Sequence, residues 1–297
     1  MQWERMTIEE YAGFRREEGM KVEMIDGVWW AEVRPFFFRP LFPFMKIDPG
    51  SRRYPSKSLI GGFLHAVPEG LAGNATMNFF VYDKLQEYAL EQLSPRRRRI
   101  TQQGLGNFSA REITDLAEFV ETAYQVYLSF FQRTNYWYQN DRVDQARFRL
   151  WAEKLYRNPR VAKIGAYRNG RLCAVETSFR VEDVIFGDHL FSDRASLNLK
   201  VTDFIMHILR QTAAVTDAKY LFVGLPSGVH SLDQSKLIRG CQLLTVPAYC
   251  KINPLALSVA KVFMKQSYRK LLQITDPDAS ALHLLKSKPA ETLFLVD

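Results

Sequence analysis

Side chains that could move a proton lie on two neighbouring apolar segments in the second half of the chain. Glu176 lies within residues 172–179, and Asp188 and His189 follow each other in the next apolar run. Consecutive residues of a strand point to opposite faces, so at most one of Asp188 and His189 would share a cleft with Glu176. We interpret Glu176 and His189 as candidate catalytic groups, because a carboxylate or an imidazole can accept the proton of an attacking amine. The plainer alternatives are a paired surface carboxylate and a hydrogen-bonded histidine.

Sequence signatures of the common metal- and nucleotide-dependent enzymes are absent. The chain has no HExxH, CxxC, GxSxG, Walker or GxGxxG pattern, and its five histidines are scattered. We therefore expect no metal site. Acyl transfer by positioning and proton shuttling remains, because it requires neither a metal nor a fixed nucleophile.

The elements that would position these groups span residues 161–253. Three short apolar or alternating runs are followed by a long amphipathic run, a short apolar strand, a short helix and a last strand. This order, β-β-β-α-β-α-β, predicts an α/β (α+β) fold in which helices flank a mixed, largely antiparallel sheet.

Several local motifs occur in the same order. The hairpin AYRNGRLCAV leads to a strand that ends at Ser192-Asp193, and Asn198-Leu199 opens a helix. Gly224 ends the next strand, and Ser235-Lys236 precedes Gly240 before the last strand. Together they resemble the GNAT acyltransferase superfamily, and within it the FemABX-like branch of aminoacyl- and acyl-transfer proteins.

This resemblance implies a donor site formed by Ser192, Asp193, Asn198 and Lys236. The amides and the positive dipole end of a helix that begins near Asn198 would suit an anion. GNAT enzymes of the common type hold the pyrophosphate of coenzyme A in a glycine-bearing loop here, but SDRASLNLK contains no glycine. The departure favours the FemABX-like branch, whose donors are aminoacyl-tRNAs or acyl carriers.

Three functions stay open at this point. The first is transfer of an acyl or aminoacyl group from acyl-CoA, an acyl carrier or aminoacyl-tRNA to an amine or a hydroxyl. The second is a catalytically silent GNAT-like module that binds a protein, RNA or an anionic membrane surface. The third is a more ordinary acyl-CoA N-acyltransferase whose hydrophobic pocket is lined by the phenylalanines of residues 36–44. The plainer alternative, which we favour for these phenylalanines, is an inter-domain or core wedge.

The resemblance also implies two GNAT-like units in tandem. We expect an incomplete N-terminal unit at 1–108, a C-terminal unit at 109–275, and a tail at 276–297 that carries a terminal strand. Within these, patterns predict a capped helix from Thr7, a hairpin at Asp26-Gly27, a helix over 76–93, a strand that starts with four arginines at 96–99, and a helix capped by Ser109.

Composition limits the class of protein. The chain has 297 residues, of which 47% are hydrophobic and 24% charged, as in a folded globular protein. Three sparse cysteines fit a reducing compartment, and neither a signal peptide nor a membrane-spanning run is predicted, so we expect a cytoplasmic protein. The net charge of +8 leaves tRNA or an anionic membrane surface as partners. A basic stripe of Lys261, Lys265 and Arg269 on a helix over 254–274 would suit such a partner, or simply solvent.

Overall fold

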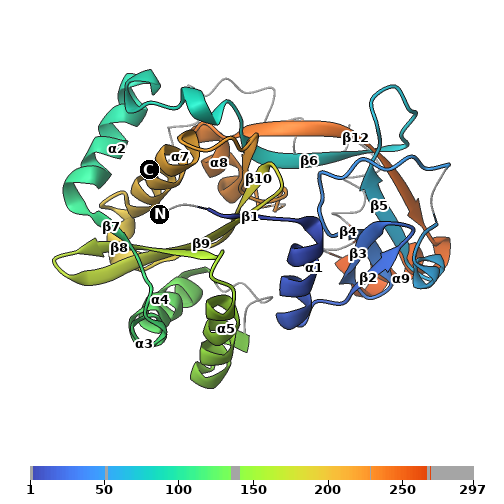
Figure 1. Cartoon of the computed structure of the whole chain (residues 1–297), viewed down its shortest axis with the longest axis horizontal. Coiled ribbons are helices and arrows are strands. Elements are labelled where there is room, and N and C mark those ends of the chain that lie inside the picture. The colour runs from blue at the N-terminus through green and yellow to red at the C-terminus, as the bar shows by residue number, and fades with distance from the viewer. Residues whose placement is uncertain (1–2, 51–52, 135–140, 228, 266–267, 269–297) are drawn as a thin grey trace. The chain divides into compact units, whose positions relative to one another are not determined.

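The computed structural model describes residues 3–50, 53–134, 141–227, 229–265 and 268 (Figure 1). The chain divides into two compact units, which are described separately below. Unit 1 comprises residues 1–7 and 81–224, and unit 2 comprises residues 8–80 and 225–297. The domain bounds expected from the sequence remain a prediction.

Unit 1 is built on a mixed, mostly antiparallel sheet. Its strands are β1 (Arg5–Met6), the end of β6 (Ala75–Tyr82), β7 (Ser109–Glu112), β8 (Ala162–Arg168), β9 (Arg171–Val181), β10 (Val184–Ser192) and β11 (Tyr220–Phe222). They lie in the order β6-β11-β10-β9-β8-β7, and β1 pairs with the end of β9. Only β10–β11 and β1–β9 are parallel.

Helices cover both faces of this sheet. They are α2 (Pro95–Asn107), α3 (Leu116–Glu118), the π-helical turn η4 (Phe119–Ala123), α4 (Tyr124–Thr134), α5 (Gln145–Arg157), α6 (Arg194–Leu197) and α7 (Val201–Ala214), with two short 3₁₀ turns, η2 (Leu85–Glu87) and η3 (Leu90–Gln92). Figure 1 shows α4 and α5 on one face of β8 and β9, and α7 with α2 on the other.

The predicted order of residues 161–253 is confirmed. It appears as β8, β9, β10, α7, β11, then α8 (His230–Ile238) and β12 (Gln242–Ile252), the last two belonging to unit 2. The β8–β9 hairpin turns at Asn169 and Gly170, both with positive φ, which the two central positions of such a tight turn require. Helix α7 connects the parallel strands β10 and β11, because parallel neighbours need a crossover connection.

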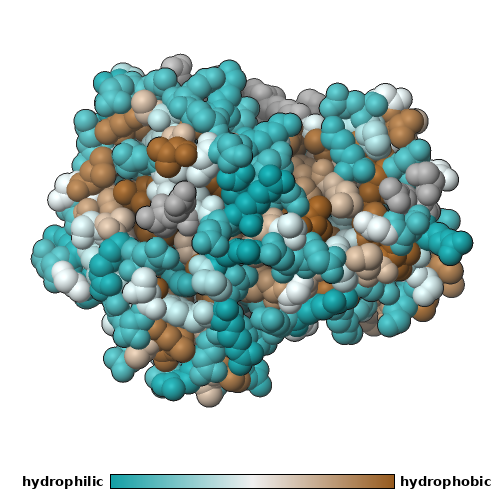
Figure 2. Space-filling view, viewed as in Figure 1, coloured by the Kyte–Doolittle hydropathy of each residue, from teal (hydrophilic) through white to brown (hydrophobic). Residues whose placement is uncertain are grey.

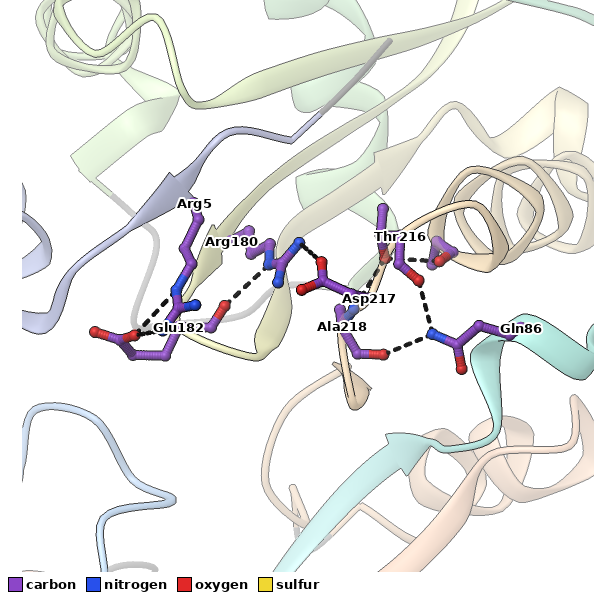
Figure 3. A network of polar contacts seen from close by, with 8 residues as sticks. Arg5, Gln86, Arg180, Glu182, Thr216, Asp217 and Ala218 are labelled. Carbon is purple, nitrogen blue, oxygen red and sulfur yellow. Dashed lines mark hydrogen bonds and ion pairs between the residues drawn. The ribbon is translucent and has the colours of Figure 1, made fainter.

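A polar network holds the start of unit 1 and the approach to β11 against the end of β9 (Figure 3). The buried guanidinium of Arg180 donates from Nε to the carbonyl of Glu182 at 2.9 Å and pairs through Nη1 with Asp217 at 2.6 Å. Arg5 of β1 pairs with the Glu182 carboxylate. Gln86 Nε2 donates to the carbonyls of Thr216 and Ala218. The Gln86 side chain therefore holds the loop before β11 through the backbone of that loop.

Unit 2 is also built of strands and helices. Its elements are α1 (Ile8–Glu17), β2 (Val22–Ile25), β3 (Val28–Arg34), β4 (Phe37–Pro40), the 3₁₀ turn η1 (Ser56–Leu59), β5 (Gly62–Ala66), most of β6, α8, β12 and α9 (Pro254–Phe263). The strand order is β2-β3-β4-β5-β12-β6. The expected helix from Thr7 and the hairpin at Asp26-Gly27 are confirmed, and both turn residues have positive φ.

Three local predictions are wrong. Residues 76–93 form β6 and two 3₁₀ turns, because buried β6 pairs with β11 and tertiary pairing overrides helical spacing. The arginines at 96–99 lie in α2, where Ser94 caps the helix and Pro95 occupies its first turn. Ser109 lies in β7, which pairs with β8, and the next helix is capped by Asp115 instead.

The expected tail at 276–297 and its terminal strand lie outside the described residues, as do Arg269 and the end of the expected helix over 254–274. Within the described part of the chain, no helix combines the length and the apolar composition that a membrane crossing requires.

Candidate functional site

Glu176 is a buried carboxyl group in the middle of β9. Its exposed fraction is 1%, and neither carboxyl oxygen has a hydrogen-bond partner among the described residues. Burial, followed by the negative charge of Asp188, raises the pKa of Glu176 well above its usual value. The Thr177 amide opposes this rise but does not reach hydrogen-bond geometry. Burial therefore favours the protonated, neutral form of Glu176.

A β-bulge brings Asp188 and His189 together. The register of β10 against β9 shifts between Gly187, which pairs with Ser178, and His189, which pairs with Thr177, so Asp188 is the extra residue. The Asp188 Oδ2 atom lies 2.9 Å from His189 Nδ1, and Thr177 Oγ1 lies 3.3 Å from the same nitrogen. The expected alternation of the two side chains therefore fails at the bulge.

The imidazole of His189 also packs against an aromatic ring. Trp151 of α5 packs edge-on against it, with ring centroids 5.3 Å apart. The side chains of Asp188 and His189 are 17% and 15% exposed, so solvent reaches both, whereas Glu176 is almost completely shielded. Two carboxyl groups of one site thus differ in environment, an arrangement that separates an acid from a base.

Gly187 leaves room for the Glu176 side chain. A Cβ atom at this position would lie 3.2 Å from Glu176 Oε1 and 3.6 Å from the Phe222 carbonyl. Pairing of β10 with β11 ends here, since Phe186–Phe222 is its last pair and β10 continues to Ser192. The carboxyl pair therefore lies where the two parallel strands separate.

Sequence reasoning named Glu176 and His189 as candidates but did not propose Asp188, whose side chain lies next to that of His189. The available signal was Gly187 inside an otherwise apolar strand, since an isolated strand glycine often marks a bulge or a close approach.

The expected donor residues Ser192 and Asp193 lie at the end of β10, and both are buried. Asp193 caps α6 by accepting from the Ser196 amide at 2.7 Å, and its Oδ2 atom lies 2.9 Å from Arg171. Asn198 ends α6 and is exposed. Asp193 therefore has a structural role that accounts for its burial, and its assignment to a donor site remains a prediction.

The start of α7 is covered by α2. A Cβ atom at Gly104 of α2 would lie 3.0 Å from the Lys200 carbonyl, so the two helices approach closely here. Arg97 of α2 pairs with Asp203 in the first turn of α7 at 2.6 Å. A carboxylate already lies at the positive end of the α7 dipole.

Lys236 lies in α8 of unit 2. Its ammonium group lies 4.7 Å from the centre of the Phe80 ring, and burial lowers its pKa despite the charge of Asp233. The structure thus groups Glu176, Asp188 and His189 in unit 1, and places Lys236 in a different unit. No group of three or more His, Cys, Asp or Glu side chains that could hold a metal ion occurs in the described ranges.

Comparisons with known proteins identify the fold. No family model matches the chain, and no curated protein matches it in sequence. Several solved structures are similar along most of its length. The C-terminal domain of a candidate lysylphosphatidylglycerol synthetase from Agrobacterium fabrum gives a TM-score of 0.55 at 11% identity, with 89% of this chain and 91% of that chain covered.

FemX gives a TM-score of 0.55 at 9% identity, over 89% of this chain and 100% of that chain. L-PGS from Bacillus licheniformis gives 0.53 at 9% identity, over 89% and 93%. Identities this low establish the fold rather than the activity. The chain has a GNAT/FemABX-like fold.

Proposed function

We propose that this chain transfers an acyl or aminoacyl group from an activated donor to an amine or a hydroxyl. The observation that carries the proposal is Glu176, a buried carboxyl group without a hydrogen-bond partner that lies beside Asp188 where β10 leaves β11. An unpaired buried acid costs folding free energy, and such groups concentrate at functional sites.

The two carboxyl groups would divide the proton transfers. Asp188, next to the His189 imidazole, takes the proton that the acceptor nitrogen or oxygen releases as it attacks the acyl carbon. A new C–N or C–O bond forms, and the bond between the acyl carbon and its carrier breaks. Glu176, whose protonated form is favoured by burial, then supplies a proton to the leaving thiolate or alkoxide.

The packing of α2 over the start of α7 limits which donor molecule could bind there. With Arg97 paired to Asp203 and Gly104 against the Lys200 carbonyl, this helix end offers little room for a pyrophosphate. We therefore favour aminoacyl-tRNA or an acyl carrier over free acyl-CoA. One similar structure is named as a lysylphosphatidylglycerol synthetase and another as L-PGS. An aminoacyl donor agrees with the first of these names.

A thermal-shift screen would select the donor. The full chain is tested with coenzyme A, long-chain acyl-CoA, acyl carrier protein and tRNA. Stabilisation by tRNA or acyl carrier protein supports the proposal, and stabilisation by acyl-CoA alone would exclude the aminoacyl-tRNA version. If none of the four raises the melting temperature, the alternative of a silent binding module is favoured.

Turnover with the selected donor tests the carboxyl pair. We expect Glu176→Gln and Asp188→Asn each to lower kcat by about 100-fold or more, the usual contribution of a positioned acid or base, while donor binding changes little. Glu121→Gln, the same chemical change at an exposed site on η4, serves as control and should be fully active. Wild-type turnover in both variants would remove the pair from the mechanism.

A further inference from the structure

Unit 2 contains a large apolar pocket that the proposed chemistry does not use. Its volume is about 810 Å³, within the size range of small-molecule sites. It lies between strands β3 to β6, the end of β12 and helix α9. Its lining includes Phe36 and Phe37 from the phenylalanine-rich segment, with Leu64 from β5 and Ala256 and Ala260 from α9.

Alternation along β4 determines which side chains enter the pocket. Phe38 and Pro40 are buried, and Phe38 belongs to the core cluster around Trp30. Phe37 and Arg39, which point the other way, line the pocket. The phenylalanine-rich segment thus serves both purposes that its sequence suggests, core packing and pocket wall.

Close backbone contact keeps the pocket wall in place. A Cβ atom at Gly61 would lie 2.4 Å from the Phe36 carbonyl, and Phe36 itself has positive φ. The Glu32 carboxylate accepts from the Phe36 amide at 2.8 Å, which stabilises this turn. The wall is therefore built into the backbone rather than formed by loose side chains.

Arg39 is a cation without an internal partner. Among the described residues its guanidinium has no hydrogen bond or ion pair, and the part of Arg39 that remains exposed lines the pocket. Burial and the charge of Arg34 lower its pKa to about 10, so it stays charged at neutral pH. A largely desolvated, unpaired cation is costly, and an anion that entered the pocket would offset that cost.

The mouth of the pocket is apolar as well. Leu59, Ile60, Leu255 and Val259 line it and are each more than half exposed. Figure 2 shows brown and tan atoms gathered over the region where Figure 1 draws β3 and β4. Exposed apolar clusters of this kind mark binding sites more often than ordinary surface.

We propose that this pocket binds a single-chain amphiphile, whose hydrocarbon chain lies against the apolar wall and whose carboxylate or phosphate pairs with Arg39. The volume is large enough to hold one such hydrocarbon chain. None of the residues that carry this inference belongs to the carboxyl pair of unit 1, so the inference stands or falls independently of the proposed transfer reaction.

Binding of matched twelve-carbon probes tests the inference directly. The fluorescent fatty acid cis-parinaric acid is bound to the full chain without any acyl donor. Dodecanoate, dodecyl phosphate and dodecanol are then each titrated as competitors. We expect saturable 1:1 binding of at least one of the two anions. Dodecanol should bind more weakly, by about tenfold or more, since the alcohol cannot form a charge-assisted bond. The tighter anion identifies the head group.

Variants locate the head group. Arg39→Met should weaken the anion about tenfold or more, to the level of dodecanol, and Arg39→Lys should retain most of the affinity. Lys261→Met removes the same charge from an exposed position of α9 outside the pocket lining and should bind as the wild type does. Ala256→Trp fills the pocket and should abolish binding of all three probes, with the melting temperature measured to verify folding.

Three results would overturn the inference. These are the absence of saturable binding, equal affinity for dodecanoate, dodecyl phosphate and dodecanol, or equal binding by Arg39→Met and Lys261→Met. Sedimentation with vesicles of diacyl phosphatidylglycerol tests whether the chain binds a membrane surface instead. If the chain sediments with the vesicles but binds no monomeric probe, the site is a membrane contact and the single-chain pocket is rejected.

Discussion

The position of Glu176 in the sheet destabilises the folded protein. Its carboxyl group is buried and unpaired, so the native state resists its ionisation while the unfolded chain does not. A raised native pKa means that the native state binds a proton more tightly than the unfolded state does. Between the unfolded pKa of Glu176, near 4.5, and its native pKa, stability must fall as pH rises.

We therefore expect Glu176→Gln to stabilise the protein at pH 8, by about 1 kcal/mol, even though it lowers turnover. The gain should decrease as the pH falls toward 4.5 and vanish well below that value, where the wild-type carboxyl group is protonated in both states. Urea unfolding of both proteins between pH 4.5 and 8 measures the difference, and Glu121→Gln provides the control. A gain that does not change with pH would show that ionisation of Glu176 is not the cause.

Among the elements, the bulge in β10 and the end of its pairing with β11 determine where the candidate site lies. The bulge in β10 brings Asp188 beside His189, and the separation of β10 from β11 leaves the Glu176 site unpaired. The opposite end of β9 is fixed instead, by the network centred on Arg180 (Figure 3). One strand thus carries an unsatisfied carboxyl group in its middle and a well-satisfied guanidinium near its end.

Arg180→Met should lower the free energy of unfolding by about 1–2 kcal/mol, because it leaves the Glu182 carbonyl without its charged donor. Arg5→Met, which removes only an exposed ion pair, should have nearly no effect. Chemical denaturation of the two variants compares them. Equal losses would indicate that burial of Arg180 adds nothing to its hydrogen bonds.

The pH dependence of this network has the opposite sign to that of Glu176. Hydrogen bonding and the charge of Arg180 lower the pKa of Asp217 in the folded state. The contribution of Asp217 is therefore present above its unfolded pKa and is lost as pH falls through the lower, native value. Asp217→Asn should reduce the melting temperature slightly at pH 7 and leave it unchanged at about pH 2, with scanning calorimetry as the measurement.

At the scale of the whole molecule, the chain passes between the two units more than once. Residues 1–7 belong to unit 1, residues 8–80 to unit 2, residues 81–224 to unit 1 again, and the remainder to unit 2. Strand β12, near the end of the described chain, pairs with β5 from its first quarter. Each unit is therefore completed by distant segments of sequence, as expected of a slowly forming, non-local topology.

A fragment of residues 109–275 tests the domain boundary expected from the sequence against the two compact units of the structure. The boundary expected at residue 108 predicts that this fragment folds alone. The contacts predict that it does not, because β12 would lack β5 and the end of β9 would lack β1. We expect the fragment to show no cooperative thermal transition by circular dichroism, whereas the full chain shows one. A cooperative transition in the fragment would support the boundary at 108.

The sequence by itself determined what depends on local order. The succession of strands and helices over residues 161–253, the hairpins at Asp26-Gly27 and Asn169-Gly170, and the candidates Glu176 and His189 follow from periodicity and turn chemistry, which act over a few residues. The same local reasoning failed at residues 76–93 and at Ser109, because pairing with distant strands outweighed helical spacing and capping.

Only the tertiary structure decided which of these side chains meet. A one-residue bulge placed the side chain of Asp188 beside that of His189, and burial raised the pKa of Glu176. The pairing of β12 with β5 helped to enclose the pocket that Arg39 lines. Each outcome depends on a register or on desolvation by segments far apart in the chain. A single sequence gives at most an indirect signal, such as Gly187 before the bulge, since a pKa and a strand register are properties of the packed molecule.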